Sequence, residues 1–256
     1  MRNKLTDELA VCGLKAALAL AENHPESINR LFLREDRLKM FTGVCKTLAE
    51  RKRPYKICEN EELEKLCKSV HHQGVVVMIE MPVIEPLSRE DLDFWDRERK
   101  TGLILHEVGN DHNLGAIARA AAFFDVHFIV VNEFDKEARL STSAYRIAEG
   151  GLEYVTVRKV SNTAAFLRDA AKQLIVIGTD SRARRRIGDL AGIVKERVEG
   201  FGRPGVALVL GNEETGLPPN IKDCCSCLLR IPGTGNIESL NVAQAAALFL
   251  REIYDL

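Results

Sequence analysis

The pattern of hydrophobic and polar positions changes near residue 82, and the regions on either side predict different arrangements of elements. In the first region, Leu9, Cys12, Ala16 and Leu20 recur at helical spacing, which predicts an amphipathic helix. Strands are predicted over residues 28–33, 54–58 and 75–79, and further helices over residues 38–51 and 61–70. Residues 1–81 are therefore predicted to form a small α/β domain.

Residues 82–100 interrupt this pattern. They contain Pro82, Pro86 and a charge-dense segment with the only tryptophan, Trp95. Prolines and dense charge are typical of a linker, here with one short helix. An indole can stack on a nucleic-acid base, but we expect Trp95 to pack against the domain that follows.

From residue 101 the chain alternates between strands and helices. Strands are predicted over residues 103–108, 126–131, 154–158, 174–177, 206–210 and 227–231. Helices are predicted over residues 113–124, 143–152, 163–172 and 189–198, and from 239 onwards. Such alternation is typical of an α/β fold with a mostly parallel sheet and helices on both faces. Residues 101–256 are therefore predicted to form a second domain.

Composition and charge limit the possible functions only slightly. A net charge of −1 gives no general reason to expect nucleic-acid binding. Basic residues do cluster at 51–56 and 182–186, although either cluster alone is more typical of a solvated loop. No apolar run approaches the roughly 20 residues needed to cross a bilayer. The acidic, helical N-terminus also differs from a secretory signal.

The cysteines indicate a cytoplasmic protein without a metal. Seven cysteines at irregular spacing are typical of reduced thiols. Cys224, Cys225 and Cys227 are close in sequence, but neighbours on a strand point to opposite faces and no second pair of ligands lies nearby. The adjacent His71 and His72 also lack partners at ligand spacing.

Three loops with little side-chain bulk follow predicted strands. The first loop leads into residues 113–119, and the other two comprise residues 211–217 and 231–242. Glycine allows a backbone to approach a ligand closely, and ligands of open α/β sheets bind beyond the carboxyl ends of the strands. The pattern predicts a nucleotide-like pocket built mainly from backbone.

In order and context, these loops resemble the three motifs of the SpoU-type (TrmH-like) RNA ribose methyltransferases of the SPOUT superfamily. The resemblance covers residues 101–256; residues 1–81 resemble that family's RNA substrate-binding domain, which is similar to a ribosomal protein, with 82–100 as the linker. It implies a trefoil knot formed by the last strands and helix, with S-adenosylmethionine bound at the knot. It also implies a homodimer through the C-terminal helix and knot region, and methylation of a ribose 2′-hydroxyl in tRNA or rRNA.

The resemblance also assigns site residues by position. The implied catalytic residues are Arg119, Asn113, Glu214, Ser239 and Asn241. The implied cofactor-binding residues are Gly178, Thr179, Leu210, Gly211, Asn212, Ile231, Ser239, Leu240 and Asn241. The basic clusters supply the expected RNA-binding residues, which are Arg51, Lys52, Arg53 and Arg182.

The chemistry suggests a role for each catalytic residue. A ribose hydroxyl attacks as its proton leaves, so the site must stabilise a developing alkoxide. Because a guanidinium keeps its proton in proteins, we expect Arg119 to hold an RNA phosphate and stabilise the alkoxide as a cation. Asn113 and Glu214 are expected to hold Arg119 or the substrate, and spacing alone leaves Glu213 as the alternative to Glu214. Ser239 is either a ligand contact or the N-cap of the last helix.

Some positions depart from the family pattern. Residues 109–112 replace the usual Asp-Pro before the asparagine of the first motif, and Asp125 stands where glycine is usual. The polar motif residues remain, so we expect activity; the alternative is a non-catalytic RNA-binding or ribosome-assembly protein on the same fold. A nicotinamide-dependent enzyme is disfavoured because residues 109–115 lack the G-x-G-x-x-G pattern.

Overall fold

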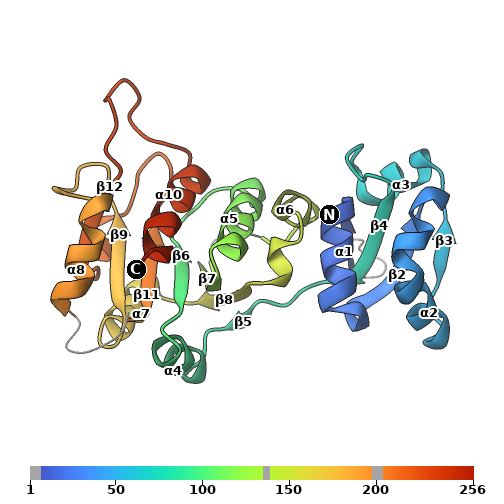
Figure 1. Ribbon diagram of the computed structural model, residues 1–256, viewed down its shortest axis with the longest axis horizontal. Coiled ribbons are helices and arrows are strands. Elements are labelled where there is room, and N and C mark those ends of the chain that lie inside the picture. The colour runs from blue at the N-terminus through green and yellow to red at the C-terminus, as the bar shows by residue number, and fades with distance from the viewer. Residues whose placement is uncertain (1–6, 135–138, 198–203) are drawn as a thin grey trace. The chain divides into compact units, whose positions relative to one another are not determined.

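The computed structural model describes residues 7–134, 139–197 and 204–256, which form two compact units (Figure 1). The first unit comprises Met1–Val83 and Arg139–Tyr154, and the second comprises Ile84–Ala138 and Val155–Leu256. This division differs from the predicted ranges in two respects: most of the expected linker belongs to the second unit, and residues 139–154 belong to the first.

In the described part of the first unit, four strands form a sheet in the order β1-β4-β2-β3. The strands are β1 (Glu8–Cys12), β2 (Ile28–Leu33), β3 (Tyr55–Ile57) and β4 (Val75–Glu80). β4 runs antiparallel to β1 and β2, and β3 runs parallel to β2. The helices are α1 (Leu14–Asn23), α2 (Thr42–Glu50) and α3 (Asn60–Cys67), with 3₁₀ turns η1 (Pro25–Ser27) and η2 (Glu35–Phe41).

The helix predicted from Leu9 to Leu20 is wrong in its first half. All five residues of β1, including Leu9 and Cys12, are buried, so this strand faces the interior on both sides and shows no alternation of buried and exposed positions. Gly13 then takes a φ of 99°, which favours glycine, and turns the chain into α1. Only Ala16 and Leu20 of the predicted set lie on a helix.

Residues 139–154 complete the first unit with α6 (Thr142–Ala148) and η3 (Gly151–Glu153). Glu149 forms an ion pair of 2.8 Å with Lys15 of α1. Gly150 has a φ of 94°, and a Cβ atom there would lie 2.6 Å from the Cβ of Ala19. A glycine is therefore required where this turn packs on α1, which explains the interruption in the helical pattern.

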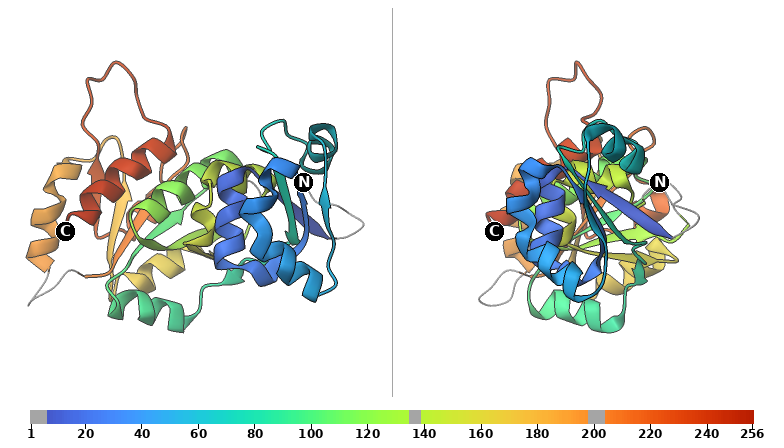
Figure 2. Two further views of the ribbon diagram at one scale, coloured as in Figure 1. Left: turned by 45° about the vertical axis from the view of Figure 1, so that its right-hand side comes forward. Right: turned by 90° about the vertical axis from the view of Figure 1, so that its right-hand side faces the viewer.

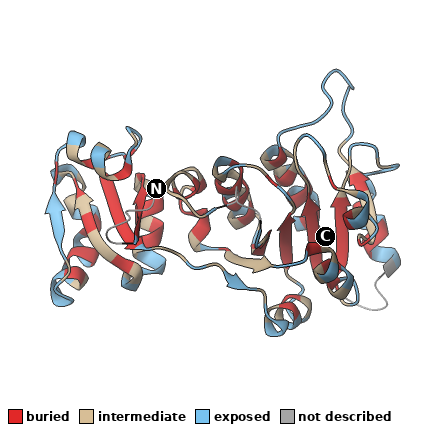
Figure 3. Ribbon diagram, turned by 180° about the vertical axis from the view of Figure 1, so that it is seen from behind, coloured by how far each residue is buried: buried red, intermediate tan, exposed pale blue. Residues whose placement is uncertain are grey.

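The described part of the second unit contains an eight-stranded sheet in the order β10-β12-β9-β11-β6-β7-β8-β5. The strands are β5 (Glu85–Pro86), β6 (Thr101–Leu105), β7 (Val126–Asn132), β8 (Thr156–Val160), β9 (Ile175–Thr179), β10 (Arg185–Arg186), β11 (Val206–Leu210) and β12 (Cys227–Arg230). Every pairing is parallel, which confirms the predicted sheet. Buried residues concentrate along its central strands (Figure 3).

Helices cover both faces of this sheet, as predicted. They are α4 (Arg89–Arg97), α5 (Asp111–Phe123), α7 (Thr163–Ala170), α8 (Leu190–Arg197), α9 (Pro219–Lys222) and α10 (Val242–Tyr254), with the 3₁₀ turn η4 (Ile187–Asp189). α4, α7 and α9 share one buried core with β6, β7, β9 and β11. α5 and α10 pack against each other and contact β7 and β11 respectively. The segment between β12 and α10 makes a long excursion from the body of this unit (Figure 2).

Trp95 packs within the second unit, as predicted, and is not available to stack on a base. Its side chain is fully buried, and its Nε1 donates hydrogen bonds of 3.1 Å to the carbonyls of Lys100 and Val206. The ring lies directly over Gly102 of β6, where an added Cβ would be 2.1 Å from the indole. The segment expected to be a linker thus anchors α4 to the sheet.

Three findings on membrane spans, metal sites and cysteines apply to the part of the chain that the structure describes. No helix among them is long and apolar enough to cross a membrane. No group of three or more of their His, Cys, Asp and Glu side chains is suited to a metal ion. The seven cysteines are free thiols.

Candidate functional site

The strand order brings the predicted loops to one edge of the sheet. β12, β9, β11 and β6 are consecutive neighbours and parallel, so their carboxyl ends lie side by side. From β6 the chain continues to β7 on one side, whereas β11 and β9 lie on the other. Such a change of direction in the strand order is where open α/β sheets bind their ligands.

The first loop is shaped by the N-terminus of α5. Asn110 is the N-cap; its φ is 57°, and its side chain accepts a hydrogen bond of 3.0 Å from the backbone N–H of Asn113. Asp111 follows in the first turn, where a negative charge stabilises the helix dipole. The departure from Asp-Pro therefore keeps the capping function, since asparagine caps a helix as well as aspartate does.

Asn113 joins the three loops through its side chain. The side chain is buried, and its Nδ2 donates to the Gly109 carbonyl at 3.0 Å and to a carboxylate oxygen of Glu213. Its Oδ1 accepts a hydrogen bond of 3.0 Å from Nδ2 of Asn241. A carboxylate can only accept, so the contact with Glu213 fixes which end of the amide faces which partner. Glu213 and Asn241 lie 100 and 128 positions away from Asn113 in the chain.

The structure distinguishes between the two neighbouring glutamates. Glu213 is half-buried and contacts Asn113, whereas the side chain of Glu214 is exposed. The backbone N–H of Glu214 instead donates to Oδ1 of Asn212 at 2.9 Å, which holds it in the turn. The residue that meets Asn113 is therefore Glu213, the alternative that spacing could not exclude.

Asn212 and Gly211 shape the second loop. The Asn212 side chain donates to the Glu107 carbonyl at 2.9 Å and accepts from the N–H of Thr215 at 3.1 Å. A Cβ atom on Gly211 would lie 2.6 Å from the backbone of Gly216, so the turn requires glycine there. The Asn212 side chain is thus committed to the loop itself, and its backbone carbonyl also accepts a hydrogen bond of 2.9 Å from the N–H of Gly216.

The last helix begins later than the sequence suggested. Asn241 is the N-cap of α10, and its side chain accepts a hydrogen bond of 2.9 Å from the N–H of Ala243. Ser239 and Leu240 lie exposed in the preceding loop, so Ser239 is not the N-cap. Asn241 both caps α10 and contacts Asn113. This one residue therefore connects the start of the helix to the hydrogen bonds around Asn113.

Arg119 lies apart from the Asn113 network. It follows Asn113 by six residues on α5, which places it about 120° away around the helix axis. Asn113 is buried and Arg119 is exposed. Within this chain the structure therefore does not bring Arg119 and Asn113 together, and it places the arginine on the solvent-facing side of α5.

The remaining residues of the cofactor-binding set have structural partners. A Cβ atom on Gly178 would lie 2.6 Å from Leu228 and 2.7 Å from the sulfur of Cys225, so the packing of β12 against β9 requires this glycine. Thr179 donates its hydroxyl to the Val209 carbonyl at 3.1 Å. The Leu210 side chain is buried, and Ile231 begins the exposed loop after β12.

Sequence reasoning overlooked His106, which directly follows β6. Its backbone N–H donates to the Leu210 carbonyl at 2.9 Å, so it lies at the carboxyl ends of the two central strands. Its Nδ1 is buried and has no hydrogen-bond partner among the described residues. A lone histidine carries no motif, so only the structure reveals an unsatisfied nitrogen here.

The predicted RNA-binding residues differ in how they are used. In the first unit, Arg51 donates to the Glu26 carbonyl at 3.2 Å, and Arg53 donates to the Ile28 carbonyl at 2.7 Å. These two guanidiniums hold the backbone around η1, whereas Lys52 between them is exposed, with a φ of 55°. In the second unit, Arg182 is exposed on the loop after β9.

Asp180 fixes that loop. Its carboxylate forms an ion pair of 2.7 Å with Lys222 and accepts a hydrogen bond of 2.9 Å from the N–H of Arg182. Burial acts to raise the pKa of Asp180, but the hydrogen bonds from Lys222 and from the Arg182 backbone outweigh it and lower the pKa below its usual range. The carboxylate is therefore ionised at neutral pH and holds the loop at both points.

Two family models match the chain. Residues 100–251 match the SpoU rRNA Methylase family, and residues 10–83 match the family described as RNA 2′-O ribose methyltransferase substrate binding. A curated relative from Nitrosomonas europaea, the 23S rRNA (guanosine-2′-O-)-methyltransferase RlmB, is 31% identical over 98% of this chain and 92% of its own. The protein of the same name from Acinetobacter baylyi is 32% identical over 94% of both chains.

A solved structure shows the same fold. The SpoU methyltransferase AviRb from Streptomyces viridochromogenes, in complex with the cofactor AdoMet, superposes with a TM-score of 0.74. The alignment covers 100% of this chain and 93% of that one, at 21% identity. At this identity the likeness concerns the fold alone, and it extends over both units of the chain.

Proposed function

The chain belongs to the SpoU rRNA methylase family, and we propose that it methylates the ribose of a guanosine in large-subunit ribosomal RNA. It is an RNA 2′-O-methyltransferase that uses S-adenosylmethionine. The choice of substrate is supported by the relatives that match nearly the whole chain at 31% and 32% identity, both named for a guanosine of 23S rRNA. Because that RNA is the substrate, we place the reaction in the cytoplasm.

The network of Asn113, Glu213 and Asn241 is the observation that carries this proposal. It joins the three motif loops at the edge where an α/β sheet binds its ligand. We assign Asn113 and Glu213 to holding the loops in register, since their polar atoms are used on one another. Asn241 couples this register to the start of α10.

The described residues fit the cofactor, which supplies an electrophilic methyl group when it is bound. The loop between β12 and α10 is exposed, and nothing lies within 4 Å of the position that a Cβ of Gly233 or Gly235 would take. The loop bounded by Ile231 and Leu240 therefore has room for a ligand beside it. The buried Nδ1 of His106 at the same edge has no hydrogen-bond partner among the described residues. Such a backbone-lined site with a few polar groups suits a nucleoside.

Arg119 and Ser239 face solvent, and we assign both to the RNA. The 2′-oxygen becomes negative as its proton leaves, and a guanidinium stabilises that charge without giving up its own proton. A cation on the exposed side of α5 can also hold the phosphate next to the target ribose.

We further propose that the active form is a homodimer through α10 and the knot region. Large apolar side chains stay exposed on this side: Phe123 at the end of α5 is 81% exposed, and Leu248 and Tyr254 of α10 are 44% and 58% exposed. The rings of Phe124 and Tyr254 lie 6.0 Å apart and connect the two helices. A second copy would cover this patch and bring the exposed Arg119 towards a neighbouring site. Replacement of Leu248 by Asp should give a monomer in sedimentation, and an unchanged dimer would exclude this interface.

We also propose that the chain forms a trefoil knot from its last strands and α10. One of these strands, β11, lies in the sheet between β9 and β6, which are not consecutive in the chain. An experimental structure whose C-terminal segment lies outside the loops around it would exclude the knot.

Methyl-label transfer tests the proposed reaction. The full chain is incubated with labelled S-adenosylmethionine and, separately, with purified 23S rRNA and total tRNA, and the nucleosides are analysed by mass spectrometry. We expect labelled 2′-O-methylguanosine from the 23S rRNA. Label in tRNA alone would change the substrate, and label on a base would change the reaction. Binding of RNA without any transfer would favour the alternative of a non-catalytic RNA-binding protein.

A further inference from the structure

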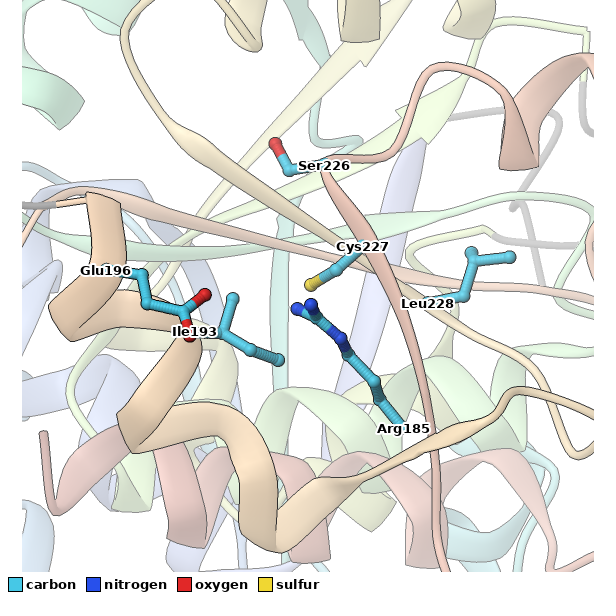
Figure 4. Close-up of a pocket in the computed structure, with 6 residues that line it drawn as sticks. All are labelled: Arg185, Ile193, Glu196, Ser226, Cys227 and Leu228. Atoms are coloured by element: carbon cyan, nitrogen blue, oxygen red, sulfur yellow. The ribbon is translucent and has the colours of Figure 1, made fainter.

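A cavity lies at the edge of the large sheet, outside the loops assigned to the cofactor. It has a volume of about 360 Å³ and is lined by Arg185, Ile193, Glu196, Ser226, Cys227 and Leu228. These residues come from β10, α8 and the start of β12 (Figure 4). Neither Arg185 nor Glu196 belongs to any motif of the methyltransferase site.

The lining combines a donor, an acceptor and a small apolar surface. In Figure 4 the guanidinium of Arg185 extends towards Cys227, and the carboxylate of Glu196 projects from the facing helix beside Ile193. Ile193 is buried, whereas Arg185 and Glu196 are exposed at the mouth of the cavity. A ligand that satisfies all three must be partly apolar and must offer both acceptors and donors.

A guanine base has these properties. Arginine pairs with its O6 and N7 acceptors in two parallel hydrogen bonds, and a carboxylate can accept from its N1–H and N2–H groups. One edge of its ring can contact the small apolar surface beside Ile193. A free phosphate fits less well, because the Glu196 carboxylate would repel it.

The loop that carries Arg185 holds further arginines. Arg182, Arg184 and Arg186 are exposed on the same loop as Arg185. The loop is held at one end by Asp180, as described above, and at the other by Asp189, which accepts a hydrogen bond of 2.7 Å from the N–H of Arg186. Guanidiniums on a fixed loop match the phosphates of a nucleic-acid strand.

The cavity is close to the candidate methyltransferase site. Arg185 is in register with Leu229 of β12, and the loop that leads to α10 begins at Ile231. Leu228 precedes Ile231 by three residues, which is about 10 Å along a strand. An RNA strand whose target ribose lies at the strand ends can therefore also reach this edge.

We propose that this cavity binds a guanine base of the substrate RNA, in a nucleotide that flanks the methylated one, while Arg182, Arg184 and Arg186 hold its phosphates. The inference rests on the proposed function for the identity of the RNA. It assigns a sequence-reading role to Arg185 and Glu196, both outside the three motif loops.

Competition binding tests the subsite with the full chain. The probes are the single-stranded pentaribonucleotides AAGAA, AAAAA and AAUAA, measured by fluorescence anisotropy. We expect the wild-type chain to bind AAGAA about tenfold more tightly than the others, as one bidentate base contact provides. Glu196→Gln should reduce this preference severalfold, because an amide offers one acceptor oxygen where the carboxylate offers two, and should leave the affinity for AAAAA unchanged. Arg184→Ala should weaken binding of all three probes equally and reduce the slope of log affinity against log salt by about 0.7.

The matched control is Glu252→Gln, which removes a charge from an exposed glutamate of α10 and should retain the preference for guanine. Equal affinity of the wild-type chain for the three probes, no binding of any, or an unchanged preference in Glu196→Gln would each overturn the subsite. Calorimetric binding of S-adenosylmethionine and methyl transfer to 23S rRNA are measured on the same preparations. Methyl transfer to 23S rRNA without a preference for guanine would support the proposed function and exclude only this subsite. A preference for guanine without methyl transfer would support the subsite and exclude the proposed function.

Discussion

The contact between Glu213 and Asn113 provides the sharpest test of the site. We consider the replacement of Glu213 by Ala, with Glu214→Ala as the control. The two glutamates are adjacent and carry the same charge, but only Glu213 accepts a hydrogen bond from Asn113. The pair of variants therefore separates the contact from the general loss of a negative charge in this loop.

The expected loss follows from the kind of hydrogen bond. A bond from a neutral amide to a carboxylate stabilises a folded structure by about 1.5–3 kcal/mol. Asn113 is buried, so its Nδ2 keeps only the Gly109 carbonyl once the carboxylate is gone. If this energy holds the three loops in register, its loss corresponds to about 10- to 100-fold in kcat/KM.

The assay is labelled methyl transfer to 23S rRNA under single-turnover conditions, together with calorimetric affinity for S-adenosylmethionine. We expect Glu213→Ala to lose activity by that factor and Glu214→Ala to retain most of it. Thermal unfolding of both variants shows whether the loss is local or global. Wild-type activity in Glu213→Ala, or a greater loss in Glu214→Ala, would refute the assignment of Glu213.

The remaining predictions concern other parts of the chain. Arg119→Ala should abolish methyl transfer while calorimetry still detects binding of S-adenosylmethionine, and turnover close to wild type would exclude Arg119 from catalysis. Gly102→Ala should destabilise the second unit by about 1–3 kcal/mol in chemical denaturation, because the new Cβ would lie 2.1 Å from the Trp95 ring; Gly188→Ala, where no atom lies within 4 Å, is the control and should change little. Burial raises the pKa of Glu153 from 4.5 to about 7, so in the folded chain this carboxyl keeps a proton that the unfolded chain releases. The stability of wild type relative to Glu153→Gln should therefore fall by about 3 kcal/mol as the pH rises from 4.5 to 7 and stay constant above that range, and a difference that does not depend on pH would contradict the raised pKa.

Local patterns in the sequence were sufficient where each element makes its own contacts. Six strands of the large sheet were predictable because a parallel strand is buried on both faces and appears as a short apolar run between turn signals, whereas the exposed two-residue strands β5 and β10 carry no such run. The packing of Trp95 was predictable for a similar reason, since a large apolar ring is expected inside. The same logic failed at residues 8–12, where a fully buried strand carried apolar positions that also fitted a helix.

The site required more than local pattern. The family motifs located the three loops, but Asn113 lies 100 and 128 residues away from the two side chains that it meets there, and no periodicity links them. Which of Glu213 and Glu214 turns inward depends on a turn that Asn212 and Gly216 close, since a change of one residue reverses the direction of a side chain. The use of Arg51 and Arg53 on backbone carbonyls likewise depends on where η1 lies.

The sequence by itself thus determined most of the strands and helices along the chain, the parallel sheet and the family, because hydrophobic burial and turn chemistry act over a few residues. Only the tertiary structure decided that residues 139–154 pack with the first unit, that Asn241 and not Ser239 caps α10, and that Glu213 contacts Asn113. Each of these depends on a contact between distant segments. Such contacts exist only once the whole chain has folded.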